Sequence, residues 1–134
     1  MRIRKPPRLS RAFGRSRPGA LCEPFTVTTT FAGDRCQVVA VAGDIDLATV
    51  AILVECVETA MKAGGALVVD LGEVTFCSGA GLRALSRVQH RGDEAGVPVA
   101  WVVRSPQLCR LLRGTGVPRF SCYRDRVHAL AALG

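Results

Sequence analysis

The chain has 134 residues, of which 49% are hydrophobic, and this length and composition are typical of a single globular domain. Its formal net charge of +7 is uneven, because seven of the 18 basic residues and none of the 11 acidic residues lie in residues 1–21. The remaining body is neutral, which argues against a nucleic-acid-binding core. No apolar run reaches the ~20 residues that span a membrane.

Residues 1–22 are predicted to form a basic, disordered tail, and residues 23–134 the folded domain. The tail lacks the apolar stretch of a secretory signal, and its prolines oppose an amphipathic helix. Solvated disorder, which includes a start assigned upstream of the true one, is the favoured interpretation. The alternatives are an electrostatic contact with nucleic acid or an anionic membrane, and a targeting role.

Two strands are predicted at the start of the domain, over residues 25–32 and 35–42, because both are rich in β-branched residues. A two-residue link, Gly33-Asp34, would make them an antiparallel hairpin. Asp46 is the expected N-cap of the next helix, which ends at Gly64-Gly65. The predicted inward face of that helix carries Val50, Val54, Val57 and Met61.

The rest of the domain alternates strands with helices. The apolar run at 67–71 predicts a strand covered on both faces, which is followed by a short connection. Ser78 and Ser105 are expected to cap two helices, the second with Pro106 in its first turn. Further strands are expected over 97–103 and 120–123. On the third helix the residues expected to face inward are Leu108, Leu111 and Leu112. A last helix is expected over 124–133, with Val127, Leu130 and Ala131 facing inward.

These elements give the order β-β-α-β-α-β-α-β-α. Strands that alternate with helices favour right-handed crossovers and a parallel sheet. The predicted fold class is therefore α/β, with a mixed, mostly parallel central sheet and an antiparallel hairpin at its N-terminal edge.

The turn Ser78-Gly79-Ala80-Gly81 joins the central strand region to the second helix. Its small side chains leave the backbone N–H groups of a helix start accessible, which favours negative charge and close contact with a partner. Ser78 has two interpretations, as a simple helix N-cap or as a phosphoacceptor and contact residue.

Charged residues on either side of this turn are candidate contacts. Arg83, Arg87 and Arg91 recur at helical spacing, either as a solvated face or as a stripe that docks on an acidic surface. Asp44 and Asp46 follow the second strand, where they serve turn formation and capping or lie beside the turn. The candidate partner-binding residues are Asp44, Asp46, Ser78, Gly79, Ala80, Gly81, Arg83 and Arg87.

A Ser–His–Asp catalytic site is not expected. His90 would lie on the same helix as Ser78, twelve residues further along, which at 1.5 Å per residue is about 18 Å away. The six cysteines, at positions 22, 36, 56, 77, 109 and 122, form no C-x-x-C pair, and with His90 and His128 they complete no zinc spacing. We interpret them as small buried hydrophobes of a cytoplasmic protein without metal or cofactor.

Four stretches of the domain form an ordered set. They are Gly43-Asp44-Ile45-Asp46-Leu47, Val68-Val69-Asp70-Leu71 with Val74-Thr75-Phe76, Gly81-Leu82, and Ser105-Pro106 followed by Leu111-Leu112-Arg113-Gly114-Thr115-Gly116. By these stretches the chain resembles, over residues 24–134, a STAS domain of the bacterial anti-sigma factor antagonist type, in which the matching segments occur in the same order.

This resemblance implies a non-enzymatic module, expected to be a monomer, that captures an anti-sigma factor, often a serine kinase, and so releases a sigma factor for transcription. In many members of the family the kinase phosphorylates a serine in a D-S-[SA]-G-L turn, and this blocks binding. Here Ser78 stands at the family's aspartate and Gly79 at its phosphoacceptor serine. The resemblance therefore predicts binding without the standard serine switch. The alternative is a STAS-fold sensor or scaffold that binds a small anion or nucleotide.

Overall fold

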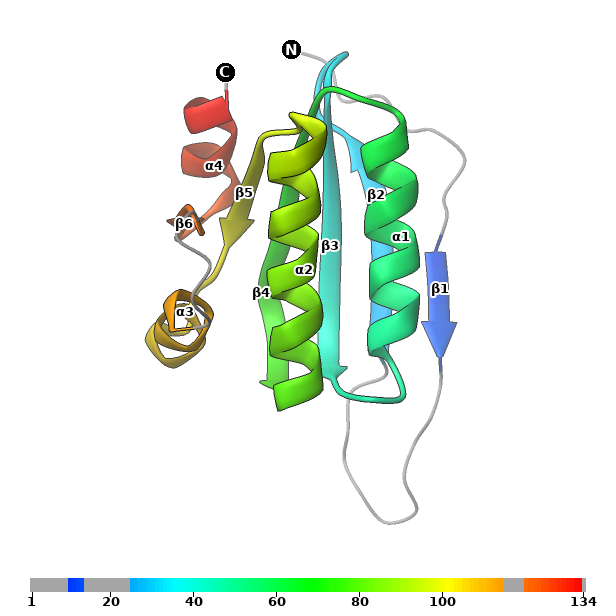
Figure 1. The fold of residues 1–134 in the computed structure, drawn as a ribbon, viewed down its shortest axis with the longest axis vertical. Coiled ribbons are helices and arrows are strands. Elements are labelled where there is room, and N and C mark those ends of the chain that lie inside the picture. Colours follow the sequence, from blue (N-terminus) through cyan, green and yellow to red (C-terminus); the bar gives the residue numbers. More distant parts are fainter. Residues whose placement is uncertain (1–9, 14–24, 115–119, 134) are drawn as a thin grey trace.

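The computed structural model describes residues 10–13, 25–114 and 120–133, which form one six-stranded sheet and four helices (Figure 1). The strands follow one another across the sheet in chain order. The elements are β1 (Ser10–Phe13), β2 (Phe25–Phe31), β3 (Cys36–Ile45), α1 (Val50–Lys62), β4 (Ala66–Cys77), α2 (Gly79–Ala95), β5 (Val99–Val102), α3 (Pro106–Arg113), β6 (Cys122–Tyr123) and α4 (Arg126–Leu133).

The predicted mixed sheet is confirmed. β1, β2 and β3 pair antiparallel, whereas β3, β4, β5 and β6 pair parallel through helical crossovers. Strand β1 was not predicted, because its short segment lies within a run of basic residues. The other residues of the predicted disordered tail, 1–9 and 14–22, lie outside the described part of the chain. The expected two-residue hairpin link is wrong, because residues 32–35 separate β2 from β3.

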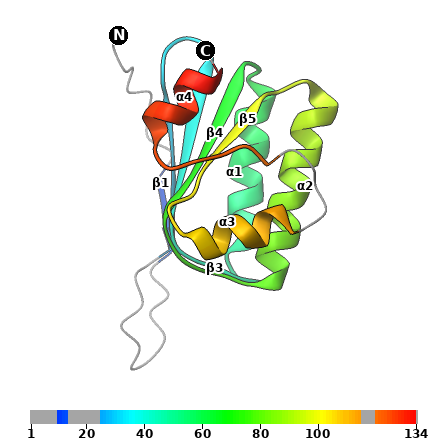
Figure 2. The same ribbon diagram turned by 90° about the vertical axis from the view of Figure 1, so that its left-hand side faces the viewer.

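The two faces of the sheet are covered unequally. Figure 2 shows α1, α2 and α3 on one face and α4 on the other. The larger core lies beneath the first three helices and includes Leu53, Leu85 and Trp101. The smaller core packs Ala129 of α4 against Val68. In the described part of the chain, no helix is long and apolar enough to cross a membrane.

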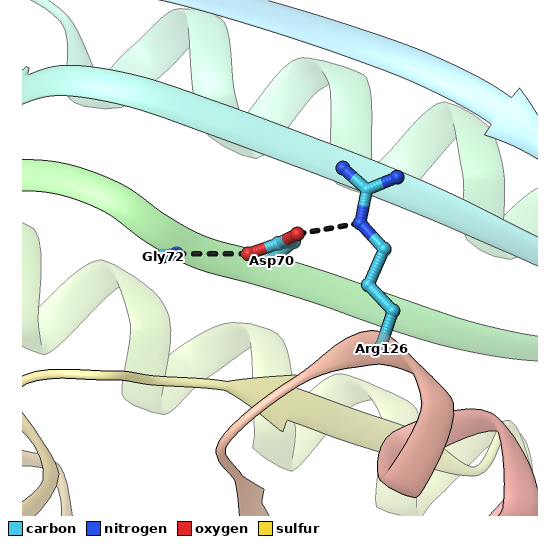
Figure 3. A network of polar contacts seen from close by, with 3 residues as sticks. All are labelled: Asp70, Gly72 and Arg126. Atoms are coloured by element: carbon cyan, nitrogen blue, oxygen red, sulfur yellow. Dashed lines mark hydrogen bonds and ion pairs between the residues drawn. The ribbon is translucent and has the colours of Figure 1, made fainter.

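Strand β4 is longer than the apolar run at 67–71 predicted. It continues to Cys77, where the sequence indicated a connection, and its register against β3 shifts between Ala40 and Ala42 and again between Gly43 and Asp44. Asp70 stabilises the first irregularity (Figure 3), because its Oδ1 accepts the Gly72 N–H at 2.8 Å. As a result the second half of β4 reaches the end of the sheet beside β3.

Asp70 also fastens the last helix to the sheet. Its Oδ2 lies 2.6 Å from Nε of Arg126, the first residue of α4, and the carboxylate side chain is only 12% exposed (Figure 3). A buried carboxylate needs such a partner, because an unpaired charge is costly away from water. The pair therefore fixes where α4 lies on its face.

Several predicted helix faces are wrong. Helix α1 begins at Val50 after Thr49, not directly after Asp46, and buries Leu53 and Ala60 together with the expected Val57. Val50 and Met61 only flank the core. On α3 and α4, Leu111 is 51% and Val127 is 74% exposed, while Ala129 is buried. Leu108 and Leu112 of α3 are buried as predicted. The residues that are buried on each helix are those that packing places next to the sheet, and the apolar periodicity of the segment only partly indicates them.

Candidate functional site

The carboxyl ends of β3 and β4 meet the start of α2 at one edge of the molecule (Figure 1). In the β3–β4 ladder, Asp44 lies opposite Phe76 and Ile45 lies opposite Cys77. The N–H of Ser78 donates to the carbonyl oxygen of Ile45 at 2.8 Å, which extends this pairing by one residue. The turn that opens α2 is therefore held directly against the end of β3.

Ser78 is the N-cap of α2, as predicted. Its backbone is extended, and its Oγ accepts the N–H of Gly81 at 3.1 Å. This bond satisfies one of the free N–H groups at a helix start. The hydroxyl that the sequence marked as a possible phosphoacceptor is thus already engaged in capping.

The two glycines of the turn have different environments. Gly79 is exposed, and a Cβ built on it would meet only Nη1 of Arg83, at 3.7 Å. Gly81 is buried, and a Cβ there would lie 2.8 Å from Cγ2 of Ile45 and 2.9 Å from Sγ of Cys77. Gly81 therefore allows α2 to approach β3, while Gly79 and the half-buried Ala80 form the accessible part of the turn.

Asp44 and Asp46 both make local hydrogen bonds. Oδ1 of Asp44 accepts the Thr75 hydroxyl at 2.6 Å, which joins the exposed ends of β3 and β4. Oδ1 of Asp46 accepts the N–H groups of Ala48 and Thr49 at 2.9 and 3.1 Å. Asp46 therefore closes the turn before α1, and Asp44 lies opposite Phe76, two residues before the turn that opens α2.

The arginine stripe of α2 extends away from this edge. Arg83 and Arg87 are exposed, and Arg91 forms an ion pair with Glu58 of α1. Arg87 lines a groove of about 380 Å³ between α1 and α2, together with Val54 and Val88. Arg83 is therefore the stripe residue next to the turn, whereas Arg87 lies about 6 Å further along the helix axis.

Two apolar side chains at the same edge were missed as site residues. Leu47, just after β3, is 80% exposed, and Phe76, near the end of β4, is 55% exposed. Both lie in stretches that carried the family resemblance. The sequence signal that could have identified them as site residues is an apolar residue just beyond a buried run. We call Asp44, Leu47, Thr75, Phe76, Gly79 and Arg83 together the strand-end surface.

The thiol and imidazole groups near this edge and along the helices lie in separate places. Burial raises the pKa of the adjacent Cys77 thiol to about 11, which leaves it protonated and unreactive near neutral pH. His90 lies on α2 and contacts Glu94, and His128 contacts Asp125 on α4. Among the described residues, no group of three or more His, Cys, Asp or Glu side chains could hold a metal ion.

Comparison with known proteins identifies relatives of this fold. Residues 28–121 match the family model described as "Mlab, STAS domain". An anti-sigma factor antagonist from Mycobacterium paratuberculosis is 29% identical, with a TM-score of 0.70 over 81% of this chain and 93% of that chain. No curated protein matches the sequence significantly.

More distant structures share the fold alone. The phosphorylated form of the Bacillus cell fate determinant SpoIIAA is 13% identical, with a TM-score of 0.64 over 81% of this chain and 99% of that chain. The murine anion transporter Slc26a9 is 17% identical, with a TM-score of 0.66 over 78% of this chain but only 18% of that chain. The family model matches well over half of the residues of the present chain. The chain therefore belongs to the STAS domain family and resembles its anti-sigma factor antagonists.

Proposed function

We propose that this chain captures an anti-sigma factor of the serine-kinase type through the strand-end surface and so regulates sigma-dependent transcription in the bacterial cytoplasm. The observation that carries the proposal is the exposure of Leu47 and Phe76 at the edge where α2 begins. Large apolar side chains are costly to leave in water, and clustered ones mark protein-binding surfaces. The likeness to an anti-sigma factor antagonist supports the nature of the partner.

The polar groups around these side chains would supply specificity. Arg83 is exposed beside the turn, and Asp44 is already oriented by its hydrogen bond from Thr75. Charges of both signs at the rim of an interface select partners and accelerate encounter more than they add affinity. The proposed contact set is the strand-end surface with Asp46, Ser78, Ala80 and Arg87 at its margins.

We further propose that binding escapes the standard serine switch. Gly79 has no hydroxyl, and the hydroxyl of Ser78 caps α2. A phosphate on Ser78 would have to displace that cap, so modification of Ser78 is the less favoured route. The turn would then remain competent for binding in the presence of an active kinase.

The test is Gly79→Asp, measured by calorimetry against purified serine-kinase anti-sigma factors from the same organism. We expect at least a tenfold loss of affinity, about 1.4 kcal/mol, because the new carboxylate lies on the contact surface. Gln107→Asp is the matched control, since it adds the same charge to the exposed first turn of α3. Unchanged affinity in Gly79→Asp, or saturable binding of a nucleotide without any protein partner, would contradict the proposal.

The proposed escape from phosphorylation is tested by Gly79→Ser. A serine fits there, because its Cβ would meet only the end of Arg83. Incubation with the kinase and ATP should leave the wild-type turn unmodified and should phosphorylate the variant at position 79. Mass analysis of peptides from residues 70–90 distinguishes the two, and a phosphate on wild-type Ser78 would refute this part of the proposal.

A further inference from the structure

Helix α1 carries apolar side chains on its outer side as well as on the side that faces the sheet. The first eight residues of α1 include one charged residue, Glu55. Leu53 and Val57 are buried, whereas Ala51 is exposed and Val54 is only half-buried. A helix that is apolar on every side is normally covered on every side. Among the described elements, none lies over the outer side of α1 (Figure 1).

These outer side chains line a groove between α1 and α2. Ala51 and Val54 of α1 and Val88 of α2 form its apolar part, and its volume is about 380 Å³. Towards the C-terminal ends of the two helices follows a second hollow of about 440 Å³, which Met61 and Ala95 line. The outer side of the helix pair is therefore hollowed and partly apolar along the whole length of α1, as is typical of a surface that binds another protein.

The two walls of the groove carry opposite charges. The α1 wall carries Glu55 and Glu58, and the α2 wall carries Arg87 and Arg91. Glu58 and Arg91 form an ion pair, so these two residues are level with each other along the helices, which run in the same direction (Figure 1). At 1.5 Å per residue, Glu55 lies about 4.5 Å before Glu58. Arg87 lies about 6 Å before Arg91, so it is nearly level with Glu55.

We propose that this groove packs against the same groove of a second copy of the chain, about a two-fold axis that runs parallel to α1 and α2. Such an axis keeps each residue at its level and brings α1 of one copy opposite α2 of the other. Each acidic wall then faces a basic wall, with Glu55 opposite the partner's Arg87. The apolar parts of the two grooves close over each other and cover Ala51 and Val54.

The charges of the groove favour a second copy over a partner whose surface has one sign. A uniformly acidic surface would be repelled by Glu55 and Glu58, and a uniformly basic surface would be repelled by Arg87. A second copy satisfies both walls, and the two-fold axis repeats every contact. A dimer of this kind departs from the monomer that the family resemblance implies, and its formation needs no anti-sigma factor.

The first measurement is the mass of the full wild-type chain by sedimentation equilibrium. A face formed by two helices is at the small end of specific interfaces, so concentrations up to about 0.5 mM are used. We expect a reversible dimer. A chain that stays monomeric over this range would overturn the proposal, and so would a groove that is covered only when a purified anti-sigma factor is added.

Charge reversals test the arrangement of the two copies. Arg87→Glu and Glu55→Arg should each weaken the dimer at least tenfold, because each places two pairs of like charges across the interface. An equimolar mixture of the two variants should dimerise about as tightly as the wild type, because opposite charges face each other again in the mixed dimer. Unfolded variants could not restore each other in this way.

Arg110→Glu is the matched control, since it reverses the charge of an exposed arginine on α3, outside the groove. It should leave the dimer unchanged. Equal weakening by Arg110→Glu and Arg87→Glu would show that net charge alone matters. A mixture that stays as weak as the single variants, or a dimer that neither reversal weakens, would refute the two-fold pairing of the grooves.

Discussion

Two helices of this protein begin with the same local motif and have different surroundings. Ser78 caps α2 by accepting the Gly81 N–H at 3.1 Å, and Ser105 caps α3 by accepting the Leu108 N–H at 3.2 Å. The third residue after each cap differs, because it is Gly81 in α2 and Leu108 in α3. Both are buried, but the glycine admits the backbone of β3 to close contact, whereas the leucine fills the core with its own side chain.

The comparison shows that a helix cap does not by itself define a functional surface. The start of α2 lies beside two exposed apolar residues, Leu47 and Phe76, at the ends of the neighbouring strands. The start of α3 follows the four-residue strand β5, which is buried throughout its length. The starts of α2 and α3 therefore differ in the exposure of the strand ends beside them. Paired substitutions at the two helix starts test this difference.

The largest expected effect concerns the close approach of α2 to β3. Gly81→Val should lower the free energy of unfolding by about 3 kcal/mol or more, because the new side chain would overlap Ile45 and Cys77. Gly79→Val is the matched control in the same turn and should cost about 1 kcal/mol or less, because that position is open. Urea denaturation of both variants measures the difference, and equal losses would show that the two glycines are not distinct.

The next effect concerns binding rather than stability. Phe76→Ala should weaken anti-sigma factor binding at least tenfold, about 1.4 kcal/mol, because exposed aromatic side chains dominate such interfaces. Leu111→Ala on α3 is the control, since that side chain is similarly exposed, at 51% against 55% for Phe76. Calorimetry on both variants decides the matter. Equal affinity losses would mean that the start of α2 is no more a binding site than α3.

The smallest effect compares the caps themselves. Ser78→Ala and Ser105→Ala should each reduce stability by about 1 kcal/mol, because each removes one side-chain hydrogen bond to a helix N–H group. Only Ser78→Ala should also weaken partner binding, because only its turn belongs to the proposed contact set. Thermal unfolding combined with calorimetry separates the two quantities. If Ser105→Ala reduced binding by the same factor, stability alone would explain both results.

Much of the fold was predictable because its signals are short in range. The caps at Ser78 and Ser105 depend on bonds between residues three positions apart. The apolar run at 67–71 correctly indicated a buried strand, because both sheet faces are covered there. The alternation of strands and helices predicted the parallel part of the sheet, and the two adjacent strands at the start of the domain predicted its antiparallel edge.

Other features could not be predicted, because they depend on what covers each segment. In the second half of β4, Gly72 and Glu73 follow the buried run and indicated a connection, although Val74 and Cys77 pack against the core. The inward faces of α1 and α4 were misassigned, because Val127 is apolar yet points away from the sheet while the small Ala129 contacts it. Phe76 was noted as part of a motif, but its exposure required the strand register.

The sequence by itself determined local conformations: the starts of α2 and α3, and the burial of the strand at 67–71 on both faces. These depend on backbone hydrogen bonds and hydrophobic periodicity within a few residues. Only the tertiary structure decided which residues share a surface, because the shifted β3–β4 register places Asp44 opposite Phe76. Contacts between distant segments depend on the packing of whole elements, which no short stretch of the chain encodes.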